Sequence, residues 1–164
     1  MSVEILGLGL FTATIGLWIG GMALAGLADL KTALRLIFVT GVVNTLLTAW
    51  LFVTGDYLSA TIIGVAGVYN FLQAGLGGFF GDHDTKTVGQ VLSYIGIFAI
   101  VLGYYLTTLD LLYTGIFTIL AGIILQAYLV ACYGKAQKTC GGVIVALSVI
   151  NTIISYGLAT GLIV

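Results

Sequence analysis

The chain has 164 residues, of which 60% are hydrophobic and 7% are charged, and its formal net charge at pH 7 is −1. A soluble domain carries about 25% charged residues because its surface faces water. This composition therefore excludes an ordinary soluble globular protein, a nucleic-acid-binding protein and a disordered chain. It predicts an all-α membrane protein whose surroundings are the lipid bilayer.

Six apolar segments follow one another, separated by short polar turns, and each is long enough for a helix to cross the hydrocarbon core, which takes about 20 residues. They cover residues 5–27, 33–54, 57–80, 88–108, 111–133 and 140–163. β-barrel strands would instead alternate over ~10 residues. We therefore expect a single six-span domain over residues 1–164. The first segment is expected to be a retained helix rather than a signal peptide, because no basic residue precedes it and further spans follow.

Orientation is predicted from the positive charges. The basic residues all fall at the first, third and fifth turns: Lys31, Arg35, Lys86, Lys135 and Lys138. The second and fourth turns carry only Asp56 and Asp110. The positive-inside rule assigns the basic turns to the cytoplasm. Both termini are then extracytoplasmic, in a multi-pass protein of the inner (plasma) membrane.

An internal repeat is indicated by matched polar residues. The three basic turns each end in Lys-Thr, at Thr32, Thr87 and Thr139, where the hydroxyl is expected to cap the following helix. Asn44 and Asn151 lie at the same distance after their respective Lys-Thr pairs. Gln73 and Gln126 lie about 53 residues apart, which is the period of the proposed repeat. The pattern predicts three copies of a helical hairpin in a compact pseudo-threefold bundle.

Amide side chains lie within the spans and should turn into the bundle, because a lipid-facing amide without a partner costs several kcal/mol. As a set they are expected to line a path for a small neutral solute, since amides both donate and accept hydrogen bonds. Trp18 and Phe71 are candidates for an apolar constriction. The alternative for each amide is a contact between helices. The predicted lining residues are Asn44, Asn70, Gln73, Gln126 and Asn151.

Ionisable side chains are missing from the middle of every span. Ion-coupled pumps and transporters usually carry carboxylates, His or Lys there, so the sequence argues against an ion pump and against redox chemistry. It contains no nucleophile–base pair, phosphate-binding loop or metal motif. We expect no catalytic residues, no metal and no cofactor.

Several motifs resemble the AmiS/UreI family of urea and short-chain amide channels. Asp29–Ala33 is similar to a D-x-K-[ST]-A pattern, and Phe38–Gly41 to the FVxG helix that follows it. Gly67–Phe71 resembles a G-x-Y-x-F run, Phe80–Asp82 a Gly-Leu-Asp-like loop, and Gly134–Lys135 a Gly-Lys run. The resemblance implies six spans with both termini outside. It also implies passive permeation of urea or small amides through a pore in each protomer of a hexameric ring.

The expected function is a passive membrane channel or transporter for a small neutral solute, not an enzyme. A second possibility is a structural or assembly subunit of a larger membrane complex, with no path through it. A third is an acetate-type permease, a family with a related six-helix design whose Asn-Pro signature cannot occur in this proline-free chain.

Overall fold

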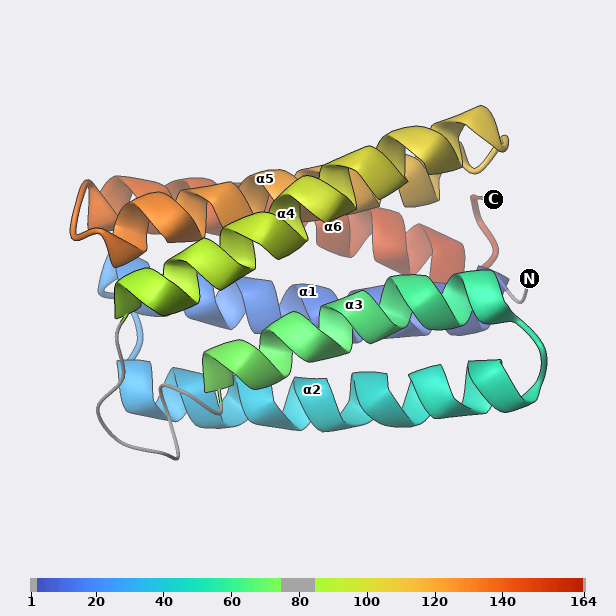
Figure 1. Ribbon diagram of the computed structural model, residues 1–164, viewed down its shortest axis with the longest axis horizontal. Helices are drawn as coiled ribbons and strands as arrows, with labels where there is room; N and C mark the ends of the chain where they lie inside the picture. The colour runs from blue at the N-terminus through green and yellow to red at the C-terminus, as the bar shows by residue number, and fades with distance from the viewer. Residues whose placement is uncertain (1–2, 75–84, 164) are drawn as a thin grey trace.

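The computed structural model describes residues 3–74 and 85–163, except the side chains of residues 3, 4, 69, 71–74 and 85. The described chain forms six α-helices that run along the long axis of the molecule (Figure 1). Their bounds are α1 Val3–Ala25, α2 Leu30–Val53, α3 Tyr57–Ala74, α4 Thr85–Thr108, α5 Leu112–Cys132 and α6 Gln137–Ala159. The all-helical class predicted from composition is confirmed.

Five of the helices, α1, α2, α4, α5 and α6, are long and apolar enough to cross a membrane. In α3 the apolar helix is described over Tyr57–Val68, and residues 75–80 of the expected third span lie outside the described part of the chain. Large apolar side chains such as Trp50, Val53 and Val101 are more than half exposed. Exposed apolar side chains in this number suit a multi-pass membrane protein, whose surface contacts lipid.

The helix ends differ from the expected bounds for local reasons. Helix α2 begins at Leu30, and its N-cap is Asp29, whose carboxylate accepts a hydrogen bond from the Thr32 backbone N–H at 2.8 Å. The expectation that Thr32 caps this helix is therefore wrong, because Thr32 already lies within the first turn. Helix α1 ends at Ala25 because Gly26 adopts a positive φ of 79° and the Leu27 N–H donates to the Met22 carbonyl.

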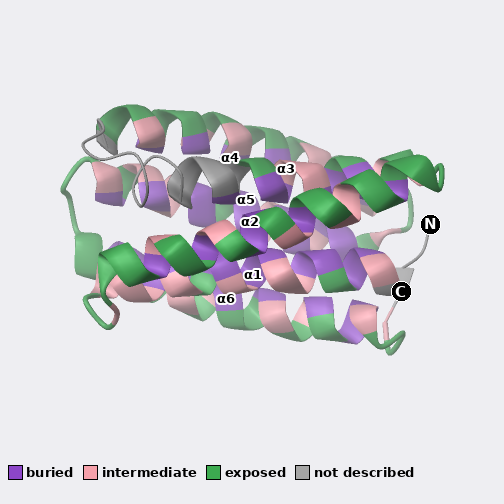
Figure 2. Cartoon of the chain, turned by 90° about the horizontal axis from the view of Figure 1, so that it is seen from below, coloured by how far each residue is buried: buried purple, intermediate pink, exposed green. Residues whose placement is uncertain are grey.

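The closest helix pairs are α4 with α5, α1 with α6, and α2 with α3. Small residues allow these approaches: a methyl group at Gly122 would lie 2.6 Å from the Gly96 carbonyl, and one at Gly141 would lie 2.8 Å from the Gly21 carbonyl. Helix α1 also packs against α2 and α3. In its most apolar stretch 56% of residues are buried, against 28% in α2 and in α4, so α1 is the more central helix. Buried residues gather on the inward sides of the helices (Figure 2).

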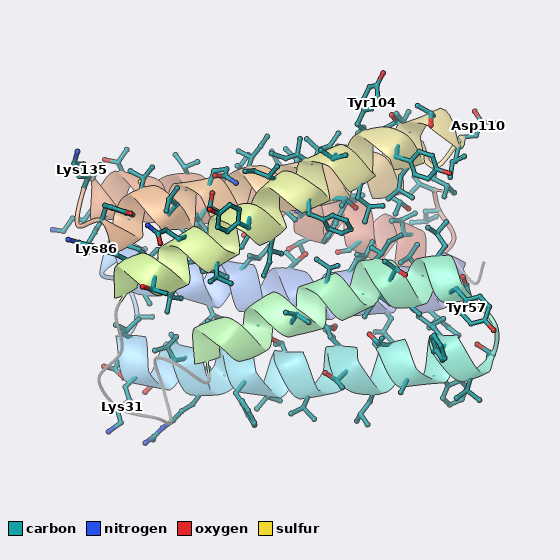
Figure 3. All side chains as sticks on the ribbon, in the orientation of Figure 1. Lys31, Tyr57, Lys86, Tyr104, Asp110 and Lys135 are labelled. Carbon is teal, nitrogen blue, oxygen red and sulfur yellow. The ribbon has the colours of Figure 1, made fainter. Side chains whose placement is uncertain are left out.

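The labelled basic residues and the labelled tyrosines lie at opposite ends of the bundle. Lys31, Lys86 and Lys135 lie at one end, and Tyr57, Tyr104 and Asp110 lie at the other (Figure 3). The chain termini lie at the end that carries Tyr57 and Asp110 (Figures 1 and 3). The three lysines labelled in Figure 3 therefore share one end of the bundle.

Candidate solute path and its buried polar groups

Asn44 lies in the middle of α2 and faces α1. Its side chain is fully buried, and the Thr12 hydroxyl lies 2.5 Å from its Oδ1, close enough to donate a hydrogen bond. The same hydroxyl lies 2.8 Å from the Gly9 carbonyl, so its single proton has two alternative acceptors. Among the described residues no atom pairs with Asn44 Nδ2. Half of this amide is therefore buried without a partner.

Asn70 on α3 is also fully buried, and neither its Oδ1 nor its Nδ2 has a partner in the described chain. It lies against Gly16 of α1 and Thr40 of α2. A methyl group at Gly16 would come within 2.7 Å of Asn70 Oδ1 and 2.9 Å of Thr40 Oγ1. The missing side chain at Gly16 therefore makes room for the amide beside the hydroxyl.

These groups form one polar cluster where α1, α2 and α3 meet. Thr12 and Gly16 are one turn apart on α1, and so are Thr40 and Asn44 on α2, so each pair lies on one side of its helix. Gly67 lies one turn before Asn70 and lets α3 approach α2 closely. A methyl group at Gly67 would lie 3.5 Å from the Asn44 Cβ. We call Thr12, Thr40, Asn44 and Asn70 the α1–α2–α3 cluster. It offers amide donors and acceptors within the apolar interior.

Asn151 lies apart from this cluster, on α6 against α5. Its Nδ2 donates to the Phe117 carbonyl at 3.3 Å, and its Oδ1 has no partner among the described residues. Ser148 and Ser155 lie on the same side of α6 and are also buried. The Ser155 hydroxyl donates to the Thr152 carbonyl of its own helix at 3.0 Å. This second group joins α6 to α5.

Gln126 is satisfied by a different helix. The Ser93 hydroxyl donates to Gln126 Oε1 at 2.7 Å, and Gln126 Nε2 donates to the Ser93 carbonyl at 2.9 Å. Both residues are part-buried in the α4–α5 pair. The geometry of this amide is that of a contact between helices, and its role in a path stays a prediction.

Of the three remaining predicted residues, the structure describes the side chain of Trp18 alone. Trp18 is 41% exposed, so its ring lies on the outside of the bundle. The side chains of Phe71 and Gln73 lie outside the described residues. Of the predicted set, the structure brings Asn44 and Asn70 into one cluster and leaves Asn151 and Gln126 in two other contacts.

Tyr128 is an interior residue that the sequence reasoning missed. It is buried, and its hydroxyl donates to the Leu17 carbonyl at 3.2 Å, which joins α5 to α1. A methyl group at Gly20 would lie 1.9 Å from this hydroxyl, so the tyrosine occupies space that only glycine leaves. Tyrosine is common at membrane interfaces, and the adjacent Gly20-Gly21 pair on α1 was the one signal for a large side chain opposite.

An interior cavity of about 30 Å³ lies between α1, α3, α4 and α5. Its walls are apolar apart from Thr118, whose hydroxyl donates to the Thr114 carbonyl of its own helix. A cavity needs about 10–15 Å³ to hold one water molecule, so this one is far smaller than an open passage. Its residues are Leu10, Ile62, Val65, Ala66, Ala99, Phe117, Thr118, Ala121 and Leu125.

Outside the bundle the clearest electrostatic feature is the cap of α2. The backbone N–H of Thr32 donates a hydrogen bond to the Asp29 carboxylate and has the largest effect on its pKa, and the Thr32 hydroxyl has the next largest. Together with the nearby charges of Lys31 and Arg35, these bonds lower the pKa of the carboxyl from its ordinary value of 3.8. In the described part of the chain no group of three or more His, Cys, Asp or Glu side chains could hold a metal ion.

Comparison with protein-family models, with curated proteins and with solved structures gives no match for the chain.

Proposed function

We propose that this protein is a passive membrane channel or transporter for a small neutral solute such as urea or a short-chain amide. The observation that carries the proposal is the pair of fully buried amides, Asn44 and Asn70, with three polar atoms unpaired in the described chain. A buried polar group without a partner costs about 1–3 kcal/mol. A passing solute that bonds to these atoms would recover that free energy.

The solute class follows from the hydrogen-bonding character of the cluster. The Nδ2 groups of Asn44 and Asn70 donate, as a solute carbonyl requires, and Asn70 Oδ1 accepts, as a solute N–H requires. Urea and short amides carry both kinds of group and no charge. Permeation then replaces the solute's bonds to water with bonds to the protein, and no covalent step occurs.

We further propose that the chain consists of three two-helix repeats, supported by coincident buried faces. The buried residues of α1 recur on α3 after 53 residues (Leu6 to Ser59), and those of α3 recur on α5 after 55 residues (Ser59 to Thr114). The matching buried sets are Leu6, Gly7, Gly9, Leu10, Ala13, Thr14 and Leu17; Ser59, Ala60, Ile62, Ile63, Ala66, Gly67 and Asn70; and Thr114, Gly115, Phe117, Thr118, Ala121, Gly122 and Leu125.

The even helices support the same repeat. Buried positions of α2 recur on α4 after 55 residues (Ile37 to Leu92) and on α6 after 107 residues (Ile37 to Ile144). The matching sets are Ile37, Gly41, Asn44 and Leu51; Leu92, Gly96, Ala99 and Leu106; and Ile144, Ser148, Asn151 and Leu158. On this register Asn44 matches Asn151, as expected, but the counterpart of Gln73 is Tyr128 rather than Gln126.

The orientation and assembly are also proposals. The gathering of Lys31, Lys86 and Lys135 at one end supports a cytoplasmic position for that end and an extracytoplasmic position for both termini (Figure 3). The resemblance to the AmiS/UreI family supports a homo-oligomer, a hexameric ring, with one path in each protomer.

The test is solute flux into proteoliposomes. Asn70→Leu should reduce urea and acetamide flux by about ten-fold, since the lost contact is worth about 1.4 kcal/mol of solute stabilisation. Gln126→Leu is the control, because it removes an amide whose two polar atoms are already paired with Ser93. Full flux through the Asn70 variant contradicts the proposal, and loss only in the Gln126 variant moves the path to the α4–α5 pair.

A structural or assembly subunit is the second candidate. The small apolar cavity of about 30 Å³ and the use of Gln126 in a helix contact favour it. Stopped-flow swelling of vesicles with urea, acetamide and formamide separates the two functions. Absence of any solute-dependent flux, together with co-purification of a stoichiometric partner, would establish the subunit.

A further inference from the structure

Helices α3 and α4 leave an open groove on the side of the bundle. They pack together much less extensively than α1 with α2 or α5 with α6, and they diverge toward the end that carries the termini (Figure 1). The groove has a volume of about 450 Å³ and is lined by Gly64, Val65 and Val68 of α3 and by Tyr94, Ile95 and Phe98 of α4. Its inner wall shares Val65 with the cavity of about 30 Å³ in the interior.

The register of the proposed repeats explains why this pair is open. Asn44 and Asn151 occupy equivalent positions and join their helices to α1 and α5: Thr12 bonds to Asn44, and Asn151 donates to the Phe117 carbonyl. The equivalent residue on α4 is Ala99, which is buried and borders the interior cavity. Position 99 of α4 therefore has no amide that could bridge to α3, and the small interior cavity lies beside it.

We propose that the α3–α4 groove binds one acyl chain of a membrane phospholipid and that alanine at position 99 keeps it open. This inference rests on the proposed membrane position and repeat and does not depend on solute permeation. The groove lies near the middle of both helices, at the depth of the hydrocarbon core, so the medium at its mouth is lipid tails.

The chemistry of the groove suits a hydrocarbon chain. Its lining is aliphatic or aromatic, and the cavity behind it is apolar, with the Thr118 hydroxyl already bonded within α5. Apolar cavities of this kind stay free of water. Val68 is 54% exposed and Tyr94 is 74% exposed, so the rim is open to the surroundings of the bundle. Among the residues that the structure describes, no charged side chain lines the groove to select a polar partner.

Native mass spectrometry of the full chain, purified from a phosphatidylcholine-containing membrane in mild detergent, tests the proposal. We expect one phospholipid to remain bound per chain. Val68→Trp fills the groove and Ala99→Asn supplies the bridging amide, so each should lower the fraction of lipid-bound chain about ten-fold. Ile123→Trp is the matched control, because Ile123 is the equivalent of Val68 on α5 and is also exposed, at 42%; it should keep the lipid.

Equal lipid retention in all four proteins, or no retained lipid in the unaltered chain, overturns the proposal. A second copy in the groove is tested by Val68→Cys in a Cys132→Ser, Cys140→Ser background. A disulfide-linked dimer that forms in the membrane while no lipid is retained would identify the occupant as another chain and also overturn it. Urea flux is measured separately, so failure of the solute proposal leaves this result unaffected.

Discussion

Gln126 and Ser93 exchange two hydrogen bonds across the α4–α5 pair, one through the serine hydroxyl and one through the serine carbonyl. Gly96, one turn from Ser93, leaves the space for this amide: a methyl group there would lie 2.7 Å from Gln126 Nε2. The pair fixes the rotation of α5 against α4, because the amide can bond to Ser93 in only one arrangement of the two helices.

The first prediction concerns the strength of this contact. Ser93→Ala removes the hydroxyl but keeps the carbonyl, so it should lower the free energy of unfolding by about 0.6 kcal/mol, as is usual for hydrogen bonds between membrane helices. Gln126→Leu should cost more, because it removes both bonds. A double-mutant cycle in detergent micelles measures the coupling, and additive effects of the two substitutions would contradict a direct contact.

The second prediction concerns the room beside Asn70. Gly16→Ala should reduce solute flux and destabilise the fold by about 1–3 kcal/mol, because the added methyl group overpacks the cluster. Gly142→Ala is the control: no atom of the described residues lies within 4 Å of a methyl group there, and the substitution should stabilise α6 slightly.

A combined variant separates packing from permeation. Adding Asn70→Ala to Gly16→Ala removes the closer of the two contacts and leaves the one with Thr40, so thermal stability should recover in part while flux stays low. Recovery of both stability and flux would show that the Asn70 amide does not contact the solute.

The third prediction concerns Tyr128. Tyr128→Phe removes the hydroxyl that donates to the Leu17 carbonyl and should cost about 0.5–1.5 kcal/mol of unfolding free energy. Gly20→Ala alone should cost more, because its methyl group would lie 1.9 Å from the hydroxyl. In the Tyr128→Phe background this clash is relieved, so unfolding measurements should give a double variant less destabilised than the sum of the two. Simple additivity would contradict the contact.

The fourth prediction concerns the cap of α2. Bonds from Thr32 lower the pKa of the Asp29 carboxyl below 3.8 in the folded protein. A lowered pKa means that the carboxylate form stabilises the fold above the ordinary pKa, and that this stabilisation is lost as the pH falls through the lowered value. An NMR titration in nanodiscs should give a value below 3.8 for Asp29. Thr32→Ala should raise it toward the ordinary value, and an unshifted pKa in both proteins would exclude the cap.

The helical class could be predicted because hydropathy is a local property of the chain. The cap of α2 required geometry, since Asp29 and Thr32 are both good capping residues and the helix begins at only one of them. The partners of Gln126 and Asn151 depend on the rotation of each helix and on glycines in neighbouring helices. Tyr128 was missed for the same reason, because its place is created by Gly20 more than a hundred residues away.

The α1–α6 pairing has a consequence for biosynthesis. Gly7 of α1 lies against Ala159 of α6, and Gly141 of α6 lies against Ala25 of α1, so each helix covers the other along its length. Ribosomes deliver helices to the bilayer in order, so the side of α1 that carries Gly7 and Gly21 is covered by α6 only after more than a hundred further residues have been inserted. Truncation before α6 should leave that side exposed and recognisable by cellular quality control. We therefore expect quality control to accept or reject this protein only once α6, its last described helix, has been inserted.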